Sequence, residues 1–498
     1  MKLHAEPGRV LGKRDPMIYG HFIEHFHRQI YGGVYDPGNP LSDEEGFRTD
    51  VLEAMRRIKV PVLRWPGGCF VSAYHWKEGV GKERIPHFDK AWRVEEPNTF
   101  GTDEYIRLCR KLGCEPYICT NAGTGTAEEM SDWVEYCNLP SEGRYAKWRI
   151  ANGYTEPHRV KYWSVGNENY GSWEMGSKTP EQWGVLTCEA AKMMKRVDPS
   201  TELSAAALTD IDWNVNLLKN CGKYLDWMSI HEYWDPIHET NDYADYEASM
   251  AYTADIGHSV RKVRGLLEAM GLEKQIRIAF DEWNLRQWYH PMIMDVDQQG
   301  LTKEEYLYPR DENDDNTKYT MADAVFTACF LNMCNRNCDI VGMANFAPIV
   351  NTRGCICTHK DGIVLRSTYH VFDLYVNYLG DVVLDTWEEE NPVKLLRAAS
   401  GEKTEVELLD VLVTSFSDRA GYAVAAVNKD AGETQTLTLD LPGCGAVTLD
   451  YISGNSTESY NDVDHEEVAI EHEELGAYRQ GMQITLRPHS VNIIRIGC

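Results

Sequence analysis

Two glutamates stand where apolar, strand-like runs of the sequence end. "VKYWSVGNE" (160–168) closes on Glu168, and "QIRIAFDEWN" (275–284) holds Glu282 near its end. A single glutamate at such a position is in most proteins a solvated loop residue. Two of them facing each other across about 5 Å can instead perform retaining glycoside hydrolysis, in which one protonates the leaving oxygen and the other attacks the anomeric carbon.

The residues around both glutamates suit that chemistry. The proton donor needs a raised pKa, which an apolar wall and a neighbouring carboxylate would supply. Asn167 could donate to the sugar hydroxyl beside the reacting carbon, although asparagine at a strand end also caps turns. Aromatic rings, which stack on the apolar faces of sugars or simply fill the core, gather at both positions: Tyr162, Trp163, Tyr170 and Trp173 at one, and Trp283, Trp288 and Tyr289 at the other.

The elements that must position these side chains alternate along the chain. Eight runs rich in Val, Ile and aromatic residues are separated by stretches with helical periodicity, which is the pattern of an α/β protein with a (β/α)₈ TIM barrel. A doubly wound open sheet is the alternative. The barrel is favoured because most of the runs end in polar or small residues, as the catalytic rim of a barrel does. The runs are 17–24, 60–67, 115–123, 160–168, 201–208, 224–233, 275–284 and 340–348.

After the eighth run the pattern changes to period-two strands broken by Gly, Asn and Asp. This pattern predicts a C-terminal antiparallel β-sandwich, jelly-roll-like, and hence two domains. We assign residues 13–374 to the barrel and 375–498 to the sandwich, with residues 1–12 as a candidate further strand of the sandwich. The acidic segment 301–320 is a solvated loop or a functional lid.

Composition excludes several classes of function. The formal net charge of −27 disfavours nucleic acid and anionic membrane surfaces as partners, because both are bound through Lys and Arg. The N-terminus lacks the apolar core of a signal peptide, and no apolar run approaches a membrane span, so we expect a cytoplasmic protein. Fourteen irregularly spaced cysteines fit reduced thiols. Buried thiols are likewise favoured over a zinc site for one cluster: Cys334, Cys338, Cys355 and Cys357.

Seven motifs in order resemble the family 51 α-L-arabinofuranosidases, within the clan of retaining (β/α)₈-barrel glycosidases. The "GNE" of the fourth run and the "DEWN" of the seventh resemble the clan as a whole. The narrower resemblance covers residues 19 to about 351, and a C-terminal β-sandwich is also the family's arrangement. The motifs are "YGHFIEH" with "IYGGVYDPG", "VLRWPGGCF", "NTFGTDEY", "KYWSVGNE", "SIHEYW" and "AFDEWN".

The resemblance implies an exo-acting hydrolase that releases terminal α-L-arabinofuranosyl residues from arabino-oligosaccharides by double displacement. It assigns the general acid/base to Glu168 and the nucleophile to Glu282. It further implies a homo-oligomer, with a hexamer as one form, and no metal or organic cofactor. The furanose pocket that it implies is lined by Glu24, Arg64, Asn167 and Tyr233, with His231 close by. Further candidates for contact with the sugar, taken from their positions beside these residues, are Cys69, His27, Trp173 and Trp288.

Three positions depart from the family's pattern and bear on which sugar fits. Cys69 follows the "WPGG" turn, where Asn or Cys is usual; His27 stands in "EHFHR", where "EHLGR" is usual; and Pro348 replaces an expected Gln. Such changes alter the sugar more readily than the reaction. β-D-Galactofuranosides and β-xylosides are therefore alternative substrates.

Two rival functions remain from the residues. His25 and His27 at the end of the first strand resemble the start of a metal-dependent barrel hydrolase, but the fifth strand offers no further His. A non-catalytic sugar-binding protein on the same scaffold is disfavoured by the presence of both glutamates.

Overall fold

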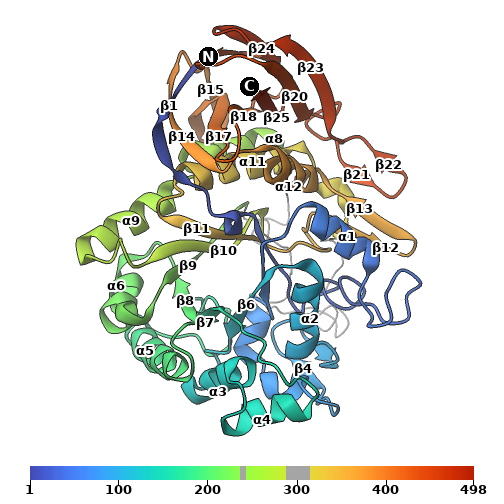
Figure 1. Ribbon diagram of the computed structural model, residues 1–498, viewed down its shortest axis with the longest axis vertical. Helices are drawn as coiled ribbons and strands as arrows, with labels where there is room; N and C mark the ends of the chain where they lie inside the picture. Colours follow the sequence, from blue (N-terminus) through green and yellow to red (C-terminus); the bar gives the residue numbers. More distant parts are fainter. Residues whose placement is uncertain (236–242, 288–313, 498) are drawn as a thin grey trace.

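A closed barrel of eight parallel strands forms the centre of the computed structural model, which describes residues 1–235, 243–287 and 314–497 (Figure 1). Every predicted run contributes one strand, so the predicted barrel is confirmed. The order of the strands around the barrel follows the chain, and the last strand pairs with the first. The strands are β2 (Gly20–Phe22), β3 (Val62–Trp65), β6 (Glu115–Thr120), β7 (Tyr162–Val165), β8 (Glu202–Ala207), β9 (Trp227–Asp235), β10 (Arg277–Arg286) and β11 (Val341–Phe346).

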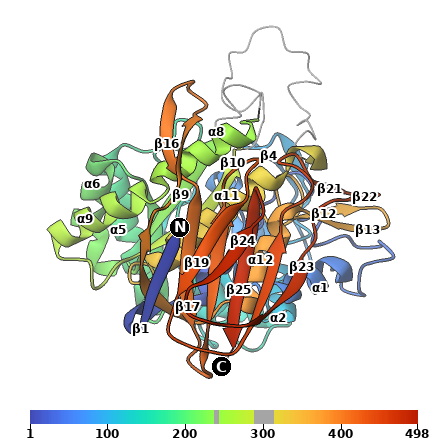
Figure 2. The ribbon, with the colours of Figure 1, turned by 90° about the horizontal axis from the view of Figure 1, so that it is seen from above.

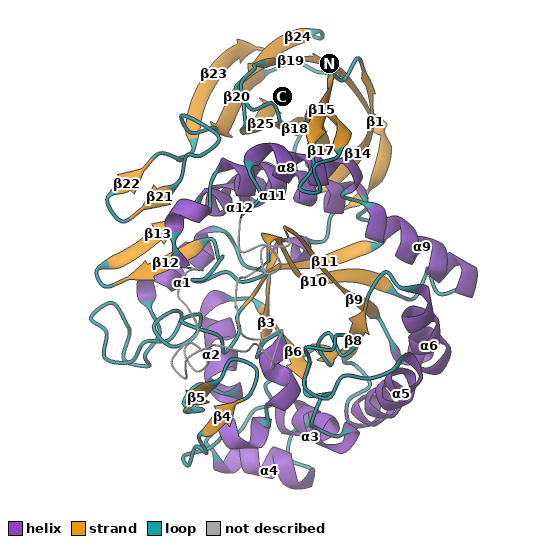
Figure 3. Ribbon diagram, turned by 180° about the vertical axis from the view of Figure 1, so that it is seen from behind, coloured by secondary structure: helices purple, strands orange, loops and turns teal. Residues whose placement is uncertain are grey.

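Helices follow the strands and cover the outside of the barrel (Figure 3). Their starts are encoded locally: Thr179 and Gln182 form a reciprocal capping box, and Pro180 occupies the first turn of its helix. No helix in the described part of the chain has the length and apolarity that a membrane span requires. The helices are α1 (Thr49–Arg57), α2 (Thr102–Leu112), α3 (Ala127–Asn138), α4 (Gly143–Ala151), α5 (Pro180–Val197), α6 (Ile211–Cys221), α8 (Tyr246–Ala251), α9 (His258–Met270), α11 (Met321–Arg336) and α12 (Ser367–Tyr378).

A layer of apolar side chains closes the barrel interior beneath its polar mouth. These side chains come from the beginnings of the strands, whereas the predicted site residues come from their ends. The polar groups at the mouth, the end of the barrel where the strands finish, therefore lie above a layer of buried apolar side chains. The layer consists of Val62, Tyr117, Tyr162, Trp227, Ala279 and Met343.

The C-terminal region forms one nine-stranded curled sheet with its own apolar core (Figures 1 and 2). It is mixed rather than fully antiparallel, because β1 (Lys2–Lys13) pairs antiparallel with β14 (Val382–Glu389) and parallel with β19 (Gln435–Asp440). The remaining strands are β17 (Leu409–Ser415), β18 (Gly421–Asn428), β20 (Ala446–Ile452), β23 (Glu471–Ala477), β24 (Met482–Leu486) and β25 (Ser490–Gly497).

Helices α11 and α12 lie between the barrel and the sheet and contact both, α12 reaching the barrel through Phe372, which packs against Phe346 of β11 (Figure 1). A hairpin of β15 (Val393–Arg397) and β16 (Lys403–Glu407) reaches from the sheet side onto α8 (Figure 2). The domain boundary between residues 374 and 375 stays a prediction; that position lies inside α12. Of the acidic segment 301–320, residues 301–313 lie outside the described residues.

Candidate active site

Glu168 lies three residues beyond the end of β7, in a turn with strained backbone. Gly166 has φ +69° and Glu168 itself φ +44°, a left-handed conformation that costs a non-glycine residue about 1 kcal/mol. The carboxylate is held from two sides: Trp173 Nε1 donates to Oε2 at 2.9 Å, and His231 Nδ1 lies 2.9 Å from Oε1. Strained, tightly held residues of this kind are concentrated at functional sites.

Asp281 and Glu282 occupy a break in the register of β10. The pairing of β10 with β9 shifts between Ala279 and Glu282. Successive residues of a regular strand point to opposite faces, and a bulge can re-aim one of them. Both carboxylates reach Arg64: its Nη1 donates to Glu282 Oε2 at 3.0 Å, and its Nε lies 3.6 Å from Asp281 Oδ2. The irregularity therefore brings two acids, not one, to the barrel interior.

Arg64 of β3 ties these acids to the end of β7. It is fully buried, and its Nη2 donates to Asn167 Oδ1 at 2.7 Å. Burial favours the neutral form of Asp281, but Arg64, together with His231 and Tyr117, outweighs it and lowers the pKa of Asp281. Asp281 is thus a fixed negative charge beneath the mouth.

His231 of β9 is the second cation of the site. Burial opposes its charging, but the surrounding carboxylates of Glu282, Asp281 and Glu168 raise the pKa of His231 to about 10. Its Nδ1 lies 2.9 Å from Glu168 and 3.6 Å from Glu282, and its Nε2 lies 3.4 Å from Asp281. At neutral pH the imidazole therefore carries a proton within reach of Glu168.

The proton donor expected to have a raised pKa does not have one in this structure. Burial does raise the pKa of Glu168, but the hydrogen bond and charge of His231 outweigh burial and lower it. The sequence-based expectation was wrong because it counted the apolar surroundings and not the imidazole. One oxygen each of Glu168 and Glu282 and one ring nitrogen of His231 all lie within 4.8 Å of one another.

Glu24, just beyond β2, is a further carboxyl at the mouth. It is buried, and it accepts hydrogen bonds from Phe70 N at 3.1 Å and Trp92 Nε1 at 3.0 Å. Burial, and then the negative charge of Glu282, raise the pKa of Glu24 to about 8. A side chain at Gly67 would approach Glu24 Cγ to 2.6 Å, so the glycine of the "WPGG" turn gives this carboxyl its space.

The similarity of the chain to known proteins identifies the family to which it belongs. Models of the α-L-arabinofuranosidase 1 domain and of the α-L-arabinofuranosidase C-terminal domain match residues 54–251 and 281–490. The intracellular exo-α-(1→5)-L-arabinofuranosidase of Halalkalibacterium halodurans is 33% identical, over 96% of this chain and 91% of its own. The chain belongs to the family 51 α-L-arabinofuranosidases.

Relatives of this enzyme extend to fungi and to solved structures. A probable α-L-arabinofuranosidase C of Aspergillus niger is 34% identical, over 99% of this chain and 96% of its own. The crystal structure of the α-L-arabinofuranosidase from Thermotoga maritima in complex with arabinose has a TM-score of 0.86, with 34% identity over the full length of both chains. The similarity therefore covers the barrel and the C-terminal sheet together.

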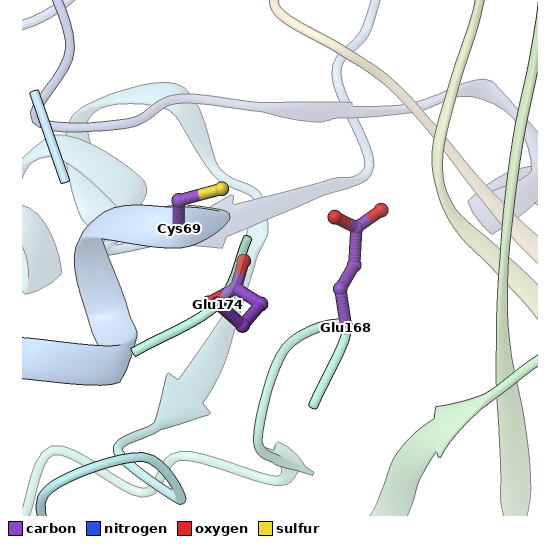
Figure 4. A group of neighbouring side chains, drawn as sticks. All are labelled: Cys69, Glu168 and Glu174. Carbon is purple, nitrogen blue, oxygen red and sulfur yellow. The ribbon is translucent and has the colours of Figure 1, made fainter. Parts of the chain in front are cut away.

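In this arabinofuranosidase Cys69 contacts a carboxylate that the sequence did not single out. Figure 4 shows Cys69 on the helical turn η2 (Cys69–Ala73) after β3, and Glu168 and Glu174 on the loop after β7. The three ligating atoms lie within 4.8 Å of one another. Burial and then the negative charges of Glu174 and Glu168 raise the pKa of the Cys69 thiol well above its usual value. Cys69 is therefore a neutral thiol.

Tyr233 and an arginine of the enzyme hold the other side of Glu282. The Tyr233 hydroxyl donates to Glu282 Oε1 at 2.6 Å and accepts from Arg353 Nη2 at 2.8 Å. The Arg353 guanidinium also stacks over the Tyr233 ring, at 4.8 Å from its centroid. Arg353 follows the eighth strand, where Pro348 had removed the expected polar side chain.

The structure brings most of the predicted site residues together, with differences in detail. Trp173, expected to stack on sugar, uses its indole N–H to hold Glu168. His27 is half-buried with φ +44° and packs edge-on against Phe26. Trp288 lies outside the described residues.

The predicted metal alternatives find no support in the described residues. His25 Nδ1 lies 3.0 Å from Glu96, and its Nε2 accepts from Trp65 Nε1 at 3.1 Å, so both ring nitrogens serve buried structural contacts. Among the described residues, neither His25 nor His27 belongs to a group of three close metal-ligating side chains. The four cysteines of the predicted cluster form no such group in the same part of the chain, and all four are buried thiols. The two groups that do occur both contain Glu168.

The sequence-based predictions did not include three residues of the site. Asp281 stands beside Glu282 in "DEWN" and would face the opposite side of a regular strand. Glu174 lies in a loop without a recognisable spacing to Glu168. Arg353 follows a strand end, which is the one signal that could have found it.

Proposed function

We propose that this enzyme releases terminal α-L-arabinofuranosyl residues from arabino-oligosaccharides with retention of configuration, using Glu168 as general acid/base and Glu282 as nucleophile. One observation carries the proposal: oxygens of the two carboxyls lie within 4.8 Å of each other. Retaining glycosidases hold their carboxyls about 5–5.5 Å apart, whereas inverting enzymes leave about 6.5–9.5 Å for a water molecule.

In the first step Glu282 attacks the anomeric carbon, and the bond to the leaving sugar oxygen breaks. Hydrogen bonds from Arg64 and Tyr233 orient the attacking carboxylate. The proton held on His231 Nδ1 passes to Glu168 Oε1 and from this carboxyl to the leaving oxygen. Glu168 and His231 thus share one proton as a pair, which is how an acid of lowered pKa can still act as donor.

In the second step water hydrolyses the ester formed with Glu282. Glu168 takes a proton from the attacking water and returns it to His231 Nδ1, which restores the starting state of the pair. The α-L-arabinofuranose product keeps its configuration because two inversions cancel. The lowered pKa of Glu168 suits this base role directly.

For sugar binding we propose the residues that surround the two carboxyls. Asn167 has its amide oxygen fixed by Arg64, so its amide nitrogen is left to donate, and the 2-hydroxyl is the group that gains most from a donor as the oxocarbenium-like transition state forms. Glu24, with its pKa near 8, can donate or accept at a second hydroxyl. Cys69, His231 and Tyr233 complete the pocket, beside Trp173, Trp288 and His27.

The proposed substrate rests on the relatives. The Halalkalibacterium halodurans protein is named an exo-α-(1→5)-L-arabinofuranosidase, and the Thermotoga maritima structure is a complex with arabinose. Turnover of nitrophenyl α-L-arabinofuranoside, β-D-galactofuranoside and β-D-xyloside distinguishes the proposed sugar from its alternatives. We expect the arabinofuranoside to have the highest kcat/KM.

The residue roles are tested by a labelling experiment and two variants. A mechanism-based furanoside should label Glu282, identified by peptide mass spectrometry, and Glu282→Ala should abolish turnover. Glu168→Ala should slow arabinobiose far more than a dinitrophenyl furanoside, because an activated phenol needs little protonation. Glu232→Gln is a matched control, since this buried carboxyl of β9 contacts His258 outside the mouth at 3.5 Å. An inverted first product by NMR, or equal impairment of both substrates in Glu168→Ala, would contradict the assignment.

We further propose that the enzyme works in the cytoplasm as a homo-oligomer, with a hexamer as the first candidate. Supporting the location, the Halalkalibacterium halodurans relative is named intracellular, and the buried cysteines of the described residues are free thiols. Light scattering after gel filtration measures the subunit number, and a single-subunit mass would refute the oligomer.

A further inference from the structure

Glu174 is a buried carboxyl to which neither step of the reaction assigns a role. It lies on the loop after β7 and has only 4% of its surface exposed. Its Oε1 accepts from Asn167 Nδ2 at 3.0 Å, and its Oε2 accepts from Ser72 Oγ at 2.5 Å. The Cys69 thiol contacts the same carboxyl (Figure 4). Three donors from two loops therefore converge on one acid.

These contacts fix the amide of Asn167 in one orientation. Arg64 can only donate, so the atom of Asn167 that it contacts at 2.7 Å must be the oxygen. The nitrogen then faces Glu174, which accepts one of its two N–H groups and leaves the second for a ligand. Without Glu174 the amide would be anchored at its oxygen alone and free to tilt about that contact.

We propose that Glu174 is a positioning residue for the reaction: it aims the second N–H of Asn167 at the 2-hydroxyl of the bound furanose. This inference rests on the proposed role of Asn167 and deepens it. In this role the ionised carboxylate of Glu174 accepts the hydrogen bond from Asn167. That ionised form is populated near neutral pH, because burial and the charge of Glu168 raise the pKa of Glu174 only to about 7. Glu174 itself need not touch the sugar.

A comparison of two substrates tests the proposal. The quantity measured is the ratio of kcat/KM for an aryl α-L-arabinofuranoside to that for the same furanoside lacking its 2-hydroxyl. Glu174→Ala, which removes the acceptor of Asn167 Nδ2, should lower this ratio about tenfold, the value of one misaimed hydrogen bond of about 1.4 kcal/mol, while turnover of the deoxy substrate changes little. Asn167→Ala should lower the ratio as well, and the double variant should lower it no further than Asn167→Ala, because both changes remove one contact.

Further variants keep the test decisive. Glu232→Gln removes a buried carboxyl elsewhere in the barrel and should leave the ratio unchanged. Glu174→Asp keeps the charge but withdraws the carboxylate from Asn167, so it should also lower the ratio. It provides the same test if Glu174→Ala unfolds below the assay temperature. Thermal unfolding of each variant checks that the fold is intact.

The outcomes separate this inference from the proposed function. If Asn167→Ala lowers the ratio and both Glu174 variants leave it unchanged, Glu174 does not position Asn167, and the role of Asn167 stands. If the Glu174 variants slow both substrates equally, the effect does not pass through the 2-hydroxyl and the inference is wrong. If Asn167→Ala leaves the ratio unchanged, the proposed role of Asn167 fails, and the inference fails with it.

Discussion

Replacing His231 with asparagine tests how the imidazole controls the ionisation of Glu168, the proposed acid/base. Burial lowers the pKa of His231, but the carboxylates around it outweigh burial and raise the pKa from 6.5 to about 10, a net effect of about 5 kcal/mol at about 1.4 kcal/mol per pKa unit. The part that belongs to Glu168 is one charged hydrogen bond of 2.9 Å, worth about 1.5–3 kcal/mol. Losing it should therefore raise the pKa of Glu168 by about 1–2 units.

The deglycosylation step isolates this effect. In the proposed mechanism Glu282 is then esterified and no longer titrates, so the acid limb of the pH profile would report Glu168 acting as base. With a dinitrophenyl furanoside, whose departure is fast, kcat measures deglycosylation. In His231→Asn the acid limb of kcat should move to higher pH by about 1–2 units. A pre-steady-state burst of phenol confirms which step limits.

A matched control breaks another histidine–glutamate contact. His258→Asn removes the partner that lies 3.5 Å from Glu232 on the outer side of β9, and its profile should coincide with that of the wild type. If the acid limb of His231→Asn also coincides with the wild type, while a burst shows that deglycosylation limits, the imidazolium does not control Glu168.

Three further predictions concern the surroundings of the site. The pKa of Glu24 is raised from 4.5 to about 8, so its contribution to stability is complete below about pH 4.5 and is lost as the pH rises through 8. The thermal midpoint should therefore fall between these pH values. Glu24→Gln should reduce the accompanying loss in the free energy of unfolding by up to about 5 kcal/mol. Gly67→Ala places a methyl 2.6 Å from Glu24 Cγ and should cost about 1–3 kcal/mol in denaturant unfolding and lower kcat/KM, whereas Gly8→Ala, with open space around it, should not. Cys69, buried and with a raised pKa, should alkylate with iodoacetamide far more slowly in the native than in the denatured enzyme; rapid native alkylation, seen by peptide mass spectrometry, would contradict its environment.

The sequence predicted the strands and the carboxyls better than it predicted their environment. Strand ends were recognisable because apolar runs stop at polar residues, and this placed Glu168 and Glu282 at the mouth. The lowered pKa of Glu168 was not predictable in the same way, because it depends on how closely His231 approaches from a strand some 60 residues later.

Asp281 and Glu174 were not predicted as site residues because both depend on local irregularities of the backbone. A regular strand would direct Asp281 away from Glu282, and only the register shift in β10 lets both contact Arg64. Glu174 contacts Asn167 through a turn of the loop after β7. Such turns follow from tertiary packing and have no periodic signature in the chain. The parallel pairing of β1 with β19 was not predicted either, because the relative direction of two strands far apart in the chain leaves no local pattern.

The first strand of the chain has a consequence for how the molecule is made. β1 completes a sheet whose other strands all follow the barrel, and the N-terminal amine bonds to Thr436 O, 435 residues away. During synthesis this segment has no partner until β14 has emerged after the barrel, and its pairing with β19 must wait longer still. Loop closure over so long a chain is slow, so joining the two ends should be a late event in folding. A nascent chain halted before β19 would carry a finished barrel and an open sheet edge, the state in which this enzyme is most exposed to aggregation.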